Sequence, residues 1–234
     1  MCYDIYILNV NLFYEVLIMK TILCYGDSNT WGYNPDGTGR YPKHIRWTSV
    51  LQSALGDSYD VIPEGLNGRT TVWNDPVRGE YRNGKAYLLP CLHSHKPIDL
   101  VILFLGSNDL KYRFNVSSNE IAQSVEMLVN IIKKSEAGPD MSSPEILVII
   151  PPPILIPEEA RKFDYLIPEY EKAVEKSKHF PQEFTAVLKG QCHLIDASKL
   201  IKTSEIDGMY LDPENHAILG KEVAKYIKEH IFNR

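Results

Sequence analysis

The sequence has few cysteines, and their spacing does not suit a metal site. Cys2, Cys24, Cys91 and Cys192 are scattered over 234 residues, without a CxxC pair or zinc-type spacing. Isolated cysteines of this kind are typical of small buried residues in a reducing compartment. We therefore expect a cytoplasmic protein without a metal ion or other cofactor.

The chain also lacks an excess of positive charge. Its 25 Lys and Arg residues are outnumbered by 30 Asp and Glu residues, which gives a formal net charge of -5. This balance argues against nucleic acid or an anionic membrane as a partner. No glycine-rich phosphate loop is present, which counts against a nucleotide-binding module.

The first eighteen residues are apolar but lack the features of a signal peptide or a membrane span. No Lys or Arg precedes the apolar part, no small-residue cleavage site follows it, and Asp4 and Glu15 interrupt it. We interpret residues 1–18 as an N-terminal extension or the product of an upstream start. An added strand or helix at an edge or a subunit contact is the alternative. Residues 19–234 are expected to form a single domain.

Strand-like runs alternate with amphipathic helices from residue 19 onward. The alternation predicts a parallel sheet with helices on both faces. Ser117 and Glu120 form a capping box before one helix, and Asp212 is expected to cap the last one. The predicted strands cover residues 21–25, 59–62, 100–105, 146–150 and 193–195, and one charged helix is expected over residues 168–189.

Polar and glycine-rich segments follow four of these strands. In a parallel sheet, ligands bind outside the carboxyl ends of the strands, so these segments should meet at one edge. They cover residues 26–32, 65–71, 106–109 and 207–216. The glycine-rich stretch 65–84 is also too long for a simple connection, which is typical of a functional loop.

Ser28 is the candidate nucleophile. It follows the first strand and begins a helical turn, where backbone N–H groups favour a developing oxyanion. The spacing is not a Gly-x-Ser-x-Gly elbow, because Thr30 stands at the second glycine. Gly68 can bring its N–H close to a ligand, and Asn108 can supply a side-chain amide donor. Taken singly, a helix cap, a turn glycine and an Asx cap explain these residues equally well or better.

Together, the segments resemble the SGNH (GDSL) hydrolase family, and within it the arylesterase/acyltransferase branch. The similar blocks extend over residues 20–232. They are Gly26-Asp27-Ser28, the Gly68 block, Gly106-Ser107-Asn108-Asp109 and Asp207-Gly208-Met209. The resemblance implies a flavodoxin-like three-layer α/β/α sandwich with a five-stranded parallel sheet of order 2-1-3-4-5.

The resemblance also implies a set of roles and an activity. Ser28 would be the nucleophile. The oxyanion hole would consist of the Ser28 N–H, the Gly68 N–H and the Asn108 side chain. Asp207 would be the acid that orients the base. The implied activity is hydrolysis of small acyl esters through an acyl-enzyme, with water or an alcohol as acceptor. The implied partner is a small-molecule ester, and the branch suggests a homo-oligomer.

The sequence departs from the family at the histidine. The family pattern is Asp-x-x-His, whereas this chain has Tyr210 three residues after Asp207. A phenol with a pKa of about 10 is neutral at pH 7 and a poor base. His216, on the first turn of the last helix, is a possible replacement base; a packed histidine at a helix start is the alternative. A second hypothesis is therefore a catalytically degenerate member that binds an ester, sugar or partner without turnover.

Four further residues are candidates for contact with the substrate: Asp27, Trp31, Tyr33 and Ile154. Trp31 and Tyr33 follow the nucleophile and could form the acyl side of a cleft, although core packing explains them as well. Ile154 follows the triple proline and could close a small acyl pocket.

Overall fold

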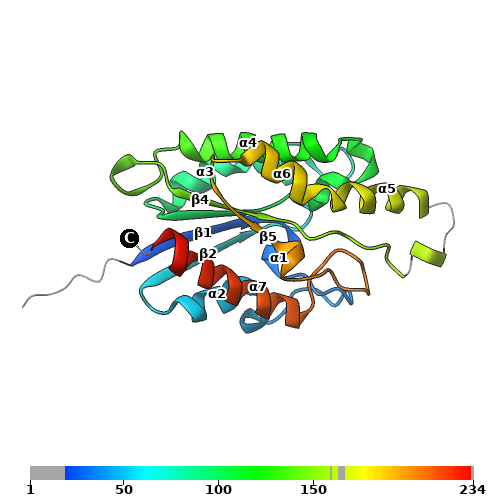
Figure 1. Cartoon of the computed structure of the whole chain (residues 1–234), viewed down its shortest axis with the longest axis horizontal. Coiled ribbons are helices and arrows are strands. Elements are labelled where there is room, and N and C mark those ends of the chain that lie inside the picture. Colours follow the sequence, from blue (N-terminus) through cyan, green and yellow to red (C-terminus); the bar gives the residue numbers. More distant parts are fainter. Residues whose placement is uncertain (1–18, 159, 163–166, 233–234) are drawn as a thin grey trace, which may run out of the picture.

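One parallel sheet forms the centre of the molecule. The computed structural model describes residues 19–158, 160–162 and 167–232, so the extension expected at residues 1–18 lies outside the described residues. In the described part, five strands pair in the order β2-β1-β3-β4-β5, all parallel (Figure 1). The sheet order implied by the resemblance is confirmed. The strands are β1 (Lys20–Gly26), β2 (Tyr59–Gly65), β3 (Leu100–Phe104), β4 (Glu145–Ile150) and β5 (His193–Asp196).

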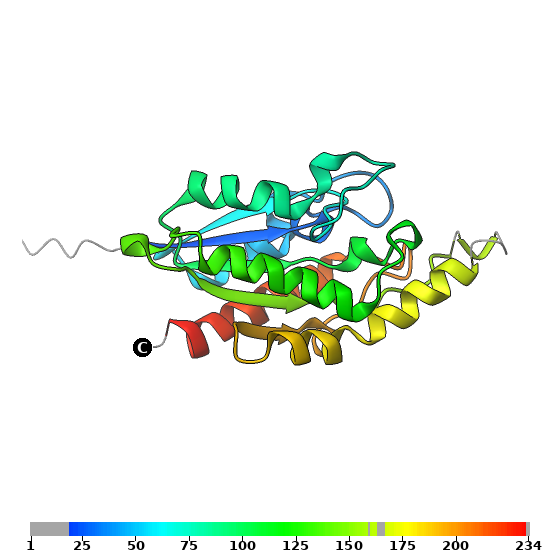
Figure 2. The same cartoon turned by 90° about the horizontal axis from the view of Figure 1, so that it is seen from above.

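Helices cover both faces of the sheet and complete the three-layer sandwich. Helices α3, α4 and α6 lie on one face, and α2 and α7 lie on the other (Figure 1); Figure 2 shows the first of these layers from above. The helices are α1 (Ser28–Trp31), α2 (Trp47–Leu55), α3 (Gly84–His95), α4 (Ser118–Lys133), α5 (Ile167–Lys178), α6 (Phe180–Leu188) and α7 (Pro213–Tyr226), which continues as a π-helix, η9 (Ile227–Ile231).

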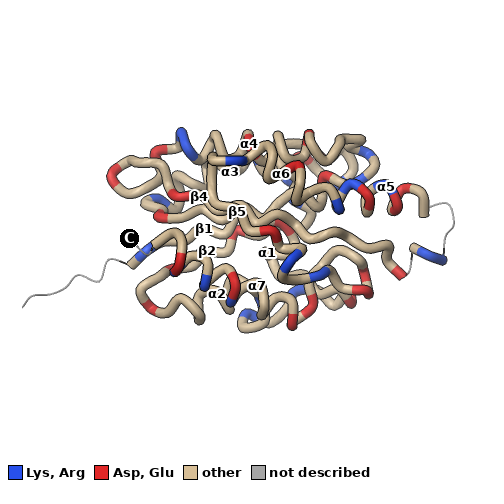
Figure 3. Tube along the Cα trace, viewed as in Figure 1, with Lys and Arg blue, Asp and Glu red and all other residues tan. Residues whose placement is uncertain are grey.

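Two apolar cores hold the layers together. Alternate residues of β1 belong to different cores: Leu23 and Tyr25 pack with α3 and α4, and Ile22 and Cys24 pack with α2 and α7. Every residue of β3 is buried, because this central strand is covered on both faces. Lys, Arg, Asp and Glu lie mainly on the outer helices and loops (Figure 3). None of the described helices combines the length and the hydropathy needed to cross a membrane.

Two expected boundaries were wrong. The second strand does not end at Pro63 but continues to Gly65, with Pro63 paired to Cys24. An edge strand tolerates a proline because only one of its sides is hydrogen-bonded. The single helix expected over residues 168–189 is two helices, because Pro181 lacks the N–H that would continue the helix and stands in the first turn of α6.

Candidate active site

The four segments expected at the carboxyl edge of the sheet do meet there. The Asn108 amide donates from Nδ2 to Asp27 Oδ2 at 3.2 Å, which joins the turns after β3 and β1. Asn29 Nδ2 donates to the Met209 carbonyl at 3.3 Å, which joins the turn after β1 to the segment that precedes α7. The Thr71 N–H and hydroxyl donate to the Asp109 carboxylate, joining the turns after β2 and β3.

Ser28 is the first residue of α1. Asp27 caps this short helix, accepting a hydrogen bond from the Asn29 N–H at 2.9 Å. The preceding Gly26 permits the sharp turn, because a Cβ there would overlap the Thr30 hydroxyl. Ser28 therefore sits at a helix N-terminus, where backbone N–H groups and the helix dipole favour a developing negative charge. Its side chain is almost enclosed, with the whole residue only 2% exposed.

Tyr210 lies close to Ser28, the candidate nucleophile, and its ring packs on Tyr33 with the centroids 4.7 Å apart. Burial, with the nearby carboxylates of Asp207 and Asp27, raises the pKa of Tyr210 to about 12, against a smaller lowering from Ser28. The phenol is therefore neutral across the physiological range and is a poorer base than a free tyrosine.

Asp207 has one oxygen engaged and one without a partner. Its Oδ1 accepts from the backbone N–H groups of Met209 and Tyr210, both at 3.0 Å. Its Oδ2 is buried and has no hydrogen-bond partner in the described part of the chain. Burial raises the pKa of Asp207, with the two backbone hydrogen bonds acting against it. The candidate acid thus keeps one carboxylate oxygen without a partner among the described residues.

His216 lies in a different part of the structure. It is fully buried where α7 packs on α2, and its Nδ1 accepts from the Trp47 N–H at 3.3 Å. Its ring meets Tyr41 edge-on, and it is not among the residues that line the cleft beside Tyr210. Burial lowers the pKa of His216 to about 4. The packed-histidine alternative describes this placement, so we do not assign His216 as a base.

The oxyanion-hole candidates lie on neighbouring loops. Gly68 has a φ of +79°, a conformation that side chains rarely adopt, so glycine is required for this turn. Asn108 is 3% exposed, and its Oδ1 accepts from Lys111 Nζ at 2.8 Å. Because an ammonium group can only donate, this contact fixes the amide so that its Nδ2 points toward Asp27 and the turn that carries Ser28.

A cleft of about 520 Å³ opens beside these residues. Of the candidate residues, Tyr33 and Ile154 line it, whereas Ser28, Trp31 and Asp27 do not. Burial raises the pKa of Asp27 to about 6, and its hydrogen bonds to Asn29 and Asn108 make it a positioning group. Other lining residues from the predicted segments are Gly68, Asn108, Met209 and Tyr210.

One group of side chains has metal-ligand types. Glu64, Cys91 and His95 bring their ligand atoms within 4.8 Å of one another. Glu64 Oε1 and His95 Nε2 already contact each other at 3.0 Å. Cys91 is fully buried, and burial raises its pKa to about 12, which keeps it a neutral thiol. The group is a hydrogen-bonded packing contact between α3 and the end of β2.

Three residues at the site were not found from the sequence: Lys111, Arg82 and Arg78, all of which line the cleft. Lys111 had a usable signal, because it stands three residues after Asn108, directly after the short 3-10 turn η3 (Ser107–Leu110). The two arginines had none, because they belong to the irregular part of the glycine-rich loop, whose path is set by tertiary contacts.

Comparison with known proteins gives consistent matches. A family model described as the GDSL-like lipase/acylhydrolase family matches residues 24–196, a range that includes Ser28, Gly68 and Asn108 and ends before Asp207. The solved structure of the native aryl esterase of M. smegmatis is 34% identical, covering 89% of this chain and 98% of that one, with a TM-score of 0.81.

Two further relatives extend the comparison. A carbohydrate acetylesterase from Sinorhizobium meliloti has 35% identity, with 89% of this chain and 98% of that chain covered and a TM-score of 0.81. A GDSL esterase/lipase of Arabidopsis thaliana is 26% identical over 205 residues, which is 78% of each chain.

Proposed function

Because the chain belongs to the GDSL-like lipase/acylhydrolase family and is a carboxylic ester hydrolase, we propose that it cleaves small acyl esters through an acyl-Ser28 intermediate. The observation that supports this proposal is that Gly68 and Asn108 line the cleft, while the Asn108 amide donates to Asp27, the residue before Ser28. The solved relatives are named an aryl esterase and a carbohydrate acetylesterase, which supports an acetyl or similarly small acyl group.

In the proposed reaction the Ser28 hydroxyl oxygen attacks the ester carbonyl carbon and loses its proton. The carbonyl oxygen becomes an oxyanion held by the Ser28 N–H, the Gly68 N–H and the Asn108 amide. Collapse of this intermediate breaks the bond to the alcohol. The alcohol leaves with a proton, and the acyl group stays on Ser28. Water, or an alcohol in a transfer reaction, then takes the acyl group and regenerates the hydroxyl.

The base is the weak part of this mechanism. With a pKa of about 12, Tyr210 is a phenolate in only about one molecule in 10⁵ at pH 7. Binding and an oxyanion hole alone give about 10³ to 10⁴ over the uncatalysed reaction. We therefore expect slow hydrolysis. The same observation favours a second candidate function, in which the protein binds an ester or sugar without turning it over.

The proposal also covers the domain organisation, the cellular location and the assembly of the protein. Residues 19–234 form one domain, the protein is cytoplasmic, and it assembles as a homo-oligomer. The free thiols of Cys24, Cys91 and Cys192 support a reducing compartment. Light scattering of the purified chain tests the assembly.

The test is hydrolysis of p-nitrophenyl acetate by the wild type and by Ser28→Ala, with intact-mass measurement of the quenched reaction. We expect slow turnover and a wild-type mass increased by one acetyl group, both absent from Ser28→Ala. Wild-type turnover equal to that of Ser28→Ala, without an adduct, would favour the binding function. A Ser28→Ala protein that still forms the adduct would contradict the assignment of the nucleophile.

A further inference from the structure

The cleft is positively charged, although the whole chain carries a formal net charge of -5. Its described lining contains the cations Arg78, Arg82, Lys111 and Arg113, against a single carboxylate, Glu169. Such a local excess of one sign in a concave site raises the local concentration of ligands of the opposite sign.

Part of this charge is neutralised within the protein. Arg113 forms a two-point pair with the fully buried Asp75, with Nη2 at 2.6 Å from Oδ2 and Nε at 3.0 Å from Oδ1. Glu169 is engaged with Lys172 on the exposed side of α5, at 3.4 Å. Glu169 therefore does not neutralise the other cations of the cleft, and the charge of Arg113 is already neutralised by Asp75.

Lys111 places a positive charge at Asn108, one of the proposed oxyanion-hole donors. Its Nζ donates to Asn108 Oδ1 at 2.8 Å, and no carboxylate oxygen of the described residues lies within salt-bridge distance of it. An ammonium group is costly to take out of water without a charged partner. Asp75 and Asp27 act on Lys111 only from beyond contact distance, so an anion that arrives with the substrate would be its first direct ionic partner.

Arg82 places another positive charge at Gly68, a second proposed oxyanion-hole donor. Its Nη1 occupies the position where a Cβ on Gly68 would stand, so the guanidinium lies directly on that glycine. Its recorded partners are neutral: the Tyr81 hydroxyl at 3.3 Å and the Tyr81 ring at 5.5 Å. A guanidinium held this way presents N–H donors that suit a carboxylate or a phosphate.

We propose that the substrate is an anionic ester, whose carboxylate or phosphate group binds between Arg82 and Lys111, a few bonds from the ester carbonyl. The inference rests on the proposed function, because it places the carbonyl between Gly68 and Asn108. The two cations flank those two donors, so a substrate held at the oxyanion hole brings its neighbouring substituents to them.

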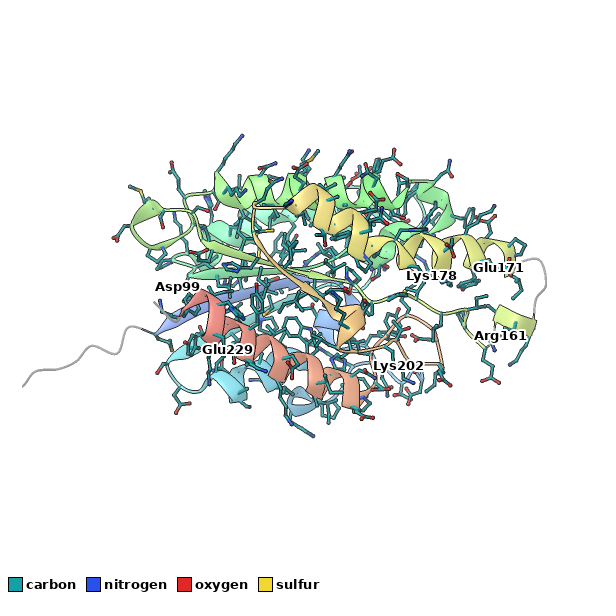
Figure 4. The ribbon with its side chains drawn as sticks, viewed as in Figure 1. Asp99, Arg161, Glu171, Lys178, Lys202 and Glu229 are labelled. Atoms are coloured by element: carbon teal, nitrogen blue, oxygen red, sulfur yellow. The ribbon has the colours of Figure 1, made fainter. Side chains whose placement is uncertain are left out.

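The first test compares p-nitrophenyl hemisuccinate with p-nitrophenyl acetate, which share a leaving group and differ in the carboxylate. We expect the wild type to show a kcat/KM for the hemisuccinate at least about tenfold higher, a preference that falls in high salt. Arg82→Gln should lower the ratio of the two kcat/KM values about tenfold. The matched control is Arg161→Gln in η6 (Ala160–Lys162), at the outer end of the molecule (Figure 4).

The result that would overturn the proposal is a ratio near one in the wild type, or a loss in Arg82→Gln that is equal for both esters. Equal loss would mean that the cation stabilises only the oxyanion. A ratio that falls equally in Arg161→Gln would also contradict it, because general charge would then be the cause.

A binding measurement separates this inference from the esterase activity itself. Calorimetry of Ser28→Ala with succinate, with inorganic phosphate and with neutral succinamide requires no turnover. Tighter binding of succinate indicates a carboxylate substrate, and tighter binding of phosphate a phosphorylated one; both support the anion site. If neither anion binds better than succinamide, the site is refuted. Anion binding with no hydrolysis of either ester would leave the site standing and contradict the proposed function.

Discussion

Tyr210 lies close to Ser28, and it stands at the place in the chain where the family pattern has a histidine. The neighbouring Asp207 keeps a buried Oδ2 without a hydrogen-bond partner among the described residues. The residues proposed as nucleophile and orienting acid both lie near Tyr210, whose side chain is a neutral phenol.

Tyr210→His should raise the kcat for p-nitrophenyl acetate by about 10² or more. An imidazole could take the Ser28 proton and donate its other N–H to Asp207 Oδ2, and general-base catalysis contributes about 10²- to 10⁴-fold. Steady-state kinetics of wild type and variant measure the change. Adding Asp207→Asn should remove most of the gain.

Tyr210→Phe is the matched control, because it keeps the ring and removes only the hydroxyl. We expect it to leave kcat within a few-fold of the wild type. A tenfold or larger loss would show that the phenol itself takes part in proton transfer, and the interpretation of Tyr210 as an inert substitution would have to be dropped.

Lys111 should impose a pH limit on activity. Burial, reinforced by Arg113, lowers the pKa of Lys111 to about 8. Below that pH the ammonium donates to Asn108 Oδ1; above it the charge is lost, so kcat and the preference for anionic esters should both fall. Lys111→Arg stays charged and should flatten this limb of the pH profile. If kcat of Lys111→Arg falls at high pH as it does in the wild type, the titration of another group causes that fall.

Asn108→Ala should lower kcat about 10²-fold with little change in KM, because one oxyanion donor is worth roughly 10² to 10³ in rate. The effect belongs to the transition state, since the carbonyl oxygen of the substrate carries a negative charge only there. Steady-state kinetics of p-nitrophenyl acetate hydrolysis measure it, and a rise in KM alone would indicate a role in substrate binding.

His216 should make the fold sensitive to acid. Its pKa is about 4 when folded and about 6.5 when unfolded, so between these values the unfolded chain binds more protons. The free energy of unfolding should fall by about 3 kcal/mol as the pH drops through this window. Burial raises the pKa of Asp27 and Asp109, which acts in the opposite direction over part of the range.

The measurement is therefore a difference in urea unfolding between wild type and His216→Asn at several pH values. The asparagine keeps an acceptor for the Trp47 N–H. His179→Asn, on an exposed side chain, is the control and should leave the pH dependence unchanged. If His216→Asn also leaves it unchanged, the low folded pKa is contradicted.

Arg113→Met should destabilise the protein by about 3 kcal/mol or more. Asp75 is fully buried, and removing its partner leaves an uncompensated carboxylate. The fall in the free energy of unfolding can be measured in urea. Asp75→Asn together with Arg113→Met should recover part of the loss, because the buried charge is then gone.

Much of the fold follows from local patterns. Five apolar runs separated by helical periodicity were enough to predict the strands, and the capping residues Ser117 and Asp212 are present as expected. The errors arose where local rules depend on neighbours. Pro63 stays in a strand because β2 lies at the edge, and Pro181 divides a helix that charge periodicity alone suggested was continuous.

The sequence by itself determined which residues could form the nucleophile and its oxyanion hole. Glycine, serine and asparagine stand directly after strands, and a parallel sheet brings its strand ends together. It also determined that Tyr210 replaces the family histidine. Only the tertiary structure decided that His216 is enclosed between α2 and α7, and that Arg82 and Lys111 flank Gly68 and Asn108. These facts depend on how side chains from distant segments pack, and no local pattern encodes that.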